Sequence, residues 1–132
     1  AGPTALAIDT VNQLLFVSDY GEPLASFGDT PSIKLLNYSG VLNSRIEGTT
    51  WDFDRPQGLA LNDSGKLLVA EGLAGLVLIF DVSDLGTISR TTELGNGELK
   101  IPLDVYIDPV SRDLYVTSSR SAEIIVYPGG GA

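Results

Sequence analysis

One pattern occurs three times along this chain, and this repetition limits the possible folds more than any other feature. Each copy begins at a proline with a short apolar run, at residues 3–9, 56–62 and 102–108. Each copy then continues through a turn into a second apolar run, at residues 15–17, 67–69 and 114–116. A third run follows, at residues 33–38, 76–80 and 124–127. Repetition at this length predicts an array of similar structural units.

The spacing of equivalent residues is consistent between copies. Pro3 and Pro102 are 99 residues apart, and the same 99 residues separate Asp9 from Asp108. The first copy differs in one respect, because its third run begins ten residues later than the other copies predict. We interpret the extra residues as an insertion at positions 21–30.

The turn after the first run is rich in Asp, Asn, Pro, Ser and Gly, at residues 9–12, 62–65 and 108–111. Such residues favour turns, because their side chains bond to the neighbouring backbone or restrict φ. The acidic residues also suit a metal site. However, every copy needs a turn at this position, so we predict a structural role for them.

A fourth, more polar strand is predicted at residues 42–47 and 88–94, whereas only residues 128–132 follow the third run of the third copy. Four antiparallel strands repeated every 40–50 residues or so are typical of a β-propeller blade. We therefore predict an all-β fold of three blades, the last lacking its outer strand. A single β-sandwich does not explain repetition in register, and a leucine-rich solenoid needs a shorter period. The predicted domain covers residues 1–132, with repeats at about 3–55, 56–101 and 102–132.

The second copy carries the most recognisable motifs. It reads Pro-Gln-Gly-Leu-Ala-Leu-Asn at 56–62, Gly-Lys-Leu-Leu-Val-Ala-Glu at 65–71 and Ile-Phe-Asp at 79–81. This string resembles the repeats of NHL-type and YVTN-type β-propellers, and the third copy resembles them over residues 102–127. The resemblance implies a disc of blades, usually six in NHL proteins, that serves as a protein-, glycan- or ligand-binding platform. It also implies that the first strand of each blade lines the axis.

Three copies are fewer than the 4–8 blades typical of closed propellers. An open arc exposes apolar blade faces and an unpaired strand edge, which proteins normally avoid. We therefore expect a partial propeller, or half of an oligomeric one. Its partners would be other copies of itself or other blades of a longer polypeptide. Two copies would close a six-bladed ring, whereas open head-to-tail addition would give a filament.

Composition narrows the functional classes. The formal net charge of -9 disfavours nucleic acid, whose phosphates would be repelled. The chain contains no Cys and no His, which excludes Cys nucleophiles, Ser-His triads and imidazole metal ligands. No apolar run approaches the roughly 18 residues of a membrane helix, so no membrane span is predicted. The absence of Met suggests a processed or trimmed product, and an extracellular, cell-surface or periplasmic location is expected.

The insertion in the first copy is the first candidate binding site, because repeat proteins concentrate binding residues on projecting loops. It contributes Glu22, Phe27 and Asp29, and it is flanked by Asp19 and Tyr20. The alternative interpretation is a neutral surface excursion or a contact between subunits.

A second candidate precedes the first strand of the second copy, and the resemblance to propellers implies that it lies on the same face as the insertion. Trp51, Asp52 and Asp54 alternate an aromatic ring with carboxylates, which suits a sugar or a cationic side chain. The alternative is that Trp51 and Phe53 pack between blades.

Asp104 is a candidate calcium ligand. It occupies a first-strand position at which the other copies have Gly58 and Ala5. An acid near the axis is similar to the pattern of calcium-dependent lactonase-like propellers, in which acidic and amide oxygens surround one ion. We expect no cofactor other than calcium.

Three functions remain open. The first is a non-catalytic extracytoplasmic propeller module for protein binding or assembly, which associates with itself into a ring or filament. The second is a calcium-dependent lactonase- or esterase-like enzyme, and the third is a glycan-binding surface adhesin.

Overall fold

The computed structural model describes residues 2–21, 30–48, 53–85 and 87–132, which form three antiparallel sheets and one 3-10 turn. Blade 1 contains β1 (Pro3–Asp9), β2 (Leu14–Asp19), β3 (Ser32–Asn37) and β4 (Leu42–Glu47). Blade 2 contains β5 (Pro56–Leu61), β6 (Lys66–Glu71), β7 (Leu76–Asp81) and β8 (Ser89–Leu94). Blade 3 contains β9 (Pro102–Ile107), β10 (Leu114–Ser118) and β11 (Glu123–Tyr127), with η1 (Ser119–Ser121) before its last strand.

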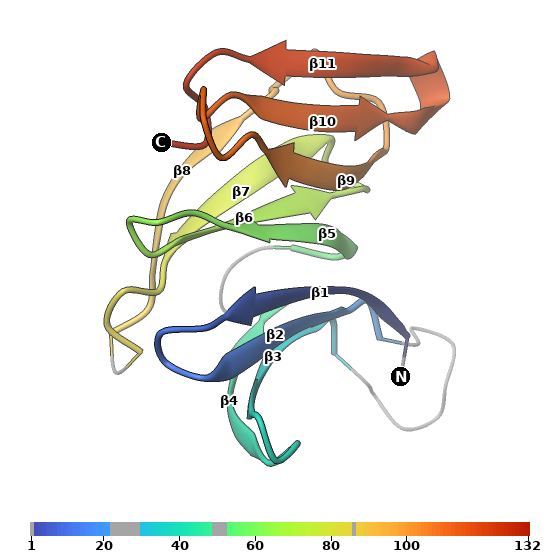
Figure 1. The fold of residues 1–132 in the computed structure, drawn as a ribbon. Coiled ribbons are helices and arrows are strands. Elements are labelled where there is room, and N and C mark those ends of the chain that lie inside the picture. Colours follow the sequence, from blue (N-terminus) through green and yellow to red (C-terminus); the bar gives the residue numbers. More distant parts are fainter. Residues whose placement is uncertain (1, 22–29, 49–52, 86) are drawn as a thin grey trace.

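Within each blade, strands that are consecutive in sequence are also neighbours in the sheet. The blades follow one another in an arc, with blade 2 between blades 1 and 3 (Figure 1). The first strands form the contacts along this arc, because β1 lies against β5 and β5 lies against β9. The predicted all-β propeller architecture is confirmed, including a third blade of three strands. Among the described residues, no helix is long and apolar enough to cross a membrane.

The acidic and amide residues after each first strand do form turns, as predicted. The side-chain oxygens of Asp9, Asn62 and Asp108 each accept backbone N–H groups from residues two to four positions further along the chain. The backbone N–H groups of Ser111 and Val110 lower the pKa of Asp108, because they stabilise its carboxylate. In each of the three residues, the Oδ1 atom is therefore bonded to the local backbone.

Each blade has two faces, which we call the N-side face, turned toward the preceding blade, and the C-side face, turned toward the following blade. Blade 2 is covered on both. Its Leu67 and Val69 pack against blade 1, whereas Leu68 and Ala70 on the same strand pack against blade 3. A strand buried on both faces needs a continuous apolar run, which explains the sequence Leu-Leu-Val-Ala at residues 67–70.

The first strands of blades 2 and 3 approach closely at Gly58. A Cβ atom at this residue would lie 2.5 Å from the Cα atom of Asp104 and 2.9 Å from the carbonyl oxygen of Leu103. The backbone spacing therefore requires glycine here. The pairing between the first and second strands of every blade also shifts in register near this position.

Candidate functional site

The last residue of each second strand binds the loop that leads into the first strand of its own blade. Asp19 accepts the N–H of Gly2 at 2.7 Å, and Glu71 accepts the N–H groups of Asp54 and Arg55. In blade 3 the hydroxyl of Ser118 accepts the N–H of Lys100 at 2.8 Å. We call these three side chains the loop acceptors. Of the three loops that they hold, the one before β5 contains the predicted binding residue Asp54.

Asp19 is almost fully buried, with 2% of its surface exposed. Burial by itself raises the pKa of its carboxyl group. Hydrogen bonds from Lys34, Gly2 and Gly21 outweigh this effect, together with the charge of Lys34, and they lower the pKa to about 2. The Nζ atom of Lys34 lies 2.6 Å from Oδ2. Asp19 therefore holds the backbone at Gly2 and Gly21 and pairs with Lys34. Its role in ligand binding stays a prediction.

Two of the predicted site residues meet in one hollow. Tyr20 follows β2 of blade 1, and Asp54 precedes β5 of blade 2, yet both line a hollow of about 430 Å³. The remaining lining consists of Pro31, Arg55 and Leu73. Tyr20 is 38% exposed there, and Leu73 is 66% exposed. An aromatic ring, an acid and a guanidinium group at a blade junction suit a polar ligand or a partner side chain.

The other predicted binding residues, Glu22, Phe27, Asp29, Trp51 and Asp52, lie outside the described residues. Their roles in ligand or glycan binding therefore stay predictions.

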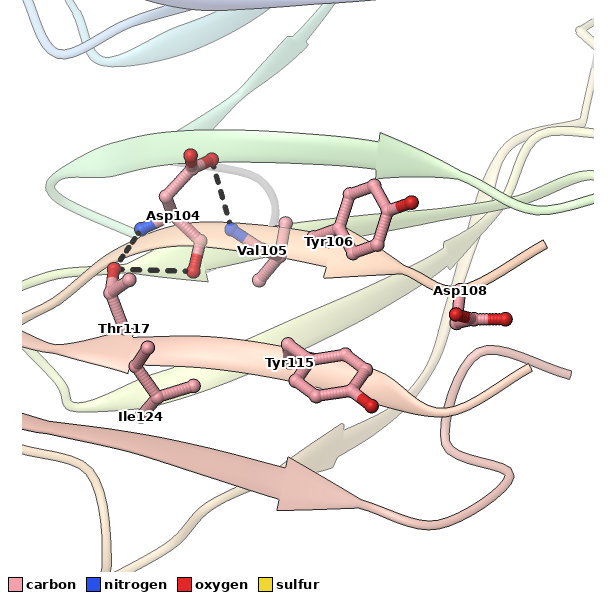
Figure 2. Close-up of a pocket in the computed structure, with 7 residues that line it drawn as sticks. All are labelled: Asp104, Val105, Tyr106, Asp108, Tyr115, Thr117 and Ile124. Carbon is pink, nitrogen blue, oxygen red and sulfur yellow. Dashed lines mark hydrogen bonds between the residues drawn. The ribbon is translucent and has the colours of Figure 1, made fainter. Parts of the chain in front are cut away.

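Asp104 lies on β9 with its carboxylate turned toward β5, as Figure 2 shows. Its Oδ1 atom accepts the N–H of Val105 at 2.9 Å, and its own N–H donates to Oγ1 of Thr117 at 2.9 Å. Across the described parts of the chain, no three or more acidic side chains gather closely enough to hold a metal ion. Calcium binding at Asp104 stays a prediction.

In the described part of the chain, no blade lies against the C-side face of blade 3. This face contains a feature that the sequence analysis did not identify. Tyr106 and Tyr115 lie side by side with ring centroids 6.3 Å apart (Figure 2). They line a hollow of about 360 Å³ together with Asp104, Asp108 and Ile124. The signal for Tyr106 was present in the repeat, because the first and second copies have Ala7 and Ala60 at this position.

Comparisons with known proteins support the fold. No family model and no curated protein matches the chain. Among solved structures, the chain is similar to virginiamycin B lyase from Staphylococcus aureus, a β-propeller protein, with a TM-score of 0.61 and 16% identity. The chain has a β-propeller fold. The match covers 98% of this chain and 43% of the lyase chain, so this chain spans less than half the length of that protein.

Proposed function

We propose that this chain is a non-catalytic, extracytoplasmic β-propeller module that assembles with further propeller blades through the two end faces of its arc. The observation that carries this proposal is the exposure of Leu6 and Ile8 on the N-side face of blade 1, at 54% and 52%. The residues equivalent to Leu6 in the other two blades, Leu59 and Val105, are only 7% and 6% exposed because a blade covers them. Blade 1 thus exposes, on its N-side face, apolar side chains of the kind that lie buried between blades elsewhere in the arc.

The opposite end face has the same character. Ile124 and Val126, on the C-side face of blade 3, are 67% and 43% exposed. The equivalent residues of blade 1, Ile33 and Leu35, are 0% and 1% exposed. Contiguous exposed apolar surface of this kind marks protein interaction sites. The apolar end faces at opposite ends of one arc favour head-to-tail contact, in which the N-side face of one copy meets the C-side face of another.

Two properties of the sequence support the non-catalytic and extracytoplasmic parts of the proposal. The absence of His and Cys removes the commonest general base and the strongest nucleophile of enzyme sites. The net charge of -9 suits a protein that remains dispersed outside the cell and avoids nucleic acid.

A photo-crosslinking experiment tests the proposed mode of assembly. Benzoylphenylalanine replaces Tyr106 in a ¹⁵N-labelled chain, which is mixed with unlabelled chain and irradiated. We expect crosslinks between labelled and unlabelled copies that map to β1 and β2 of the partner copy. The same probe at Val110, which is 90% exposed in a turn, serves as the control and should give none. Absence of crosslinks between copies at Tyr106 would contradict the proposal.

One observation favours a second candidate, a calcium-dependent lactonase- or esterase-like propeller. Asp104 and Asp108 both line the hollow on blade 3, which places two carboxylates beside a cavity large enough for a small ligand. A response of thermal stability to calcium tests this candidate, as described below.

A further inference from the structure

The outer edge of blade 3 differs from the outer edges of the other two blades. In blades 1 and 2 the third strand pairs with a fourth strand, β4 or β8. In blade 3 the order is β11-β10-β9, so β11 is an edge strand. A hollow of about 710 Å³ runs along this edge, lined by Glu98 and by all five residues of β11. An edge strand presents unpaired backbone N–H and C=O groups that can bind another strand.

The two complete blades define what such a strand should contain. Pairing within the blades places Ile124 of β11 at the same position as Ile33 of β3 and Val77 of β7. The residue opposite Ile33 is Ile46, and the residue opposite Val77 is Leu94. Both fourth strands therefore place an aliphatic side chain at this position.

The next two positions also agree between the blades. Opposite the residues equivalent to Ile125, the fourth strands have charged residues, Arg45 and Glu93. Opposite the residues equivalent to Val126, they have hydroxyl residues, Ser44 and Thr92. The register shifts after this pair in both blades. The shared pattern, read along the fourth strand, is Ser or Thr, then a charged residue, then Ile or Leu.

We propose that the edge of β11 binds an extended segment donated by another polypeptide, with the pattern Ser/Thr, then Lys/Arg, then Ile/Leu. The strand adds antiparallel to β11, and its aliphatic residue covers Ile124, which is 67% exposed. Glu98 and Glu123 line the hollow along this edge, so a basic residue is preferred at the charged position. Binding therefore combines main-chain hydrogen bonds with two side-chain requirements. This site shares Ile124 with the end face proposed above, but it binds through the backbone edge of β11 and not through the face of the blade.

The chain supplies its own probe. A synthetic peptide with the sequence of residues 41–48, Val-Leu-Asn-Ser-Arg-Ile-Glu-Gly, contains the complete pattern. We would titrate it into the ¹⁵N-labelled chain and follow backbone amide signals by NMR. The expected result is saturable change at residues 123–127 and slowed amide exchange on β11. A peptide with Asp at the position of Ile46 should bind at least tenfold more weakly, and one with Glu at the position of Arg45 should also bind more weakly.

A protein variant provides the matched control. Ile124→Asp should weaken binding of the peptide at least tenfold, whereas Val110→Asp, in a turn away from this edge, should leave it unchanged. Saturable change elsewhere than β11, or equal binding of the three peptides, would overturn the proposal. Pairing of β11 with β11 of a second copy would also overturn it, and would appear as a dimer that the peptide does not dissociate. Crosslinking at Tyr106 reports on the end faces separately, so the two proposals can fail independently.

Discussion

The loop acceptor of blade 2, Glu71, provides the most demanding test of the role that we assign to the loop acceptors. Glu71 is 1% exposed, and its carboxylate accepts the backbone N–H groups of Asp54, Arg55 and Ala74. Replacing it with Ala leaves three donors without their acceptor. A lost acceptor costs about 1–3 kcal/mol for each buried donor. Because Asp54, Arg55 and Ala74 lie near the surface, water replaces part of this loss, and we expect about 3 kcal/mol in total for Glu71→Ala.

Urea denaturation at pH 7, followed by far-UV circular dichroism, measures this loss as a change in the free energy of unfolding. Glu71→Gln keeps the shape and one carbonyl acceptor, so it should lose about half as much. Glu93→Ala is the control, because Glu93 is an exposed residue that forms an ion pair with Arg90, and it should change stability by less than about 1 kcal/mol. The reasoning is refuted if Glu71→Ala costs no more than Glu93→Ala.

Three further predictions concern packing, pH and metal. Gly58→Ala should destabilise the chain by about 1–3 kcal/mol in the same assay, because its Cβ would collide with β9, and an unchanged midpoint would contradict the close approach of β5 and β9. The pKa of Asp19 falls from 3.8 to about 2 on folding, so its contribution to stability is complete above about pH 5 and is lost as the pH decreases toward 2. Thermal melts across this range should show a smaller decline in melting temperature for Asp19→Asn than for the unmodified chain, and equal declines would argue against this role. If calcium binds at Asp104, it should raise the melting temperature, and Asp104→Ala should abolish that response; absence of any shift with calcium would eliminate the calcium hypothesis.

The repeat made most of the fold predictable, because each element occurs in several copies. The predicted fourth strand at residues 42–47 coincides with β4, and the predicted strand at 88–94 differs from β8 by one residue. The turn role of Asp9, Asn62 and Asp108 also followed from the repeat, since a structural position must be filled in every copy. The positions of the strands and turns were therefore predictable from strand periodicity and from the turn-forming residues alone.

The candidate site was less predictable because it depends on contacts between copies. The sequence does not reveal that Glu71 accepts three backbone N–H groups, since its donors are both distant and local along the chain. It likewise did not indicate that Tyr20 and Asp54 line one hollow, because their loops belong to different blades. Tyr106 was overlooked for another reason. Its unusual size becomes informative only when the small residues at its position, Ala7 and Ala60, are known to lie at blade junctions.

The native mass of this chain tests the central claim most directly, namely that the two end faces are assembly surfaces. Size-exclusion chromatography with light scattering, over a range of concentrations, would measure it. The account predicts a mass that rises above the 13.9 kDa of one chain, to a closed dimer of six blades or to larger head-to-tail species. A well-folded species that stays at 13.9 kDa at every concentration would contradict it.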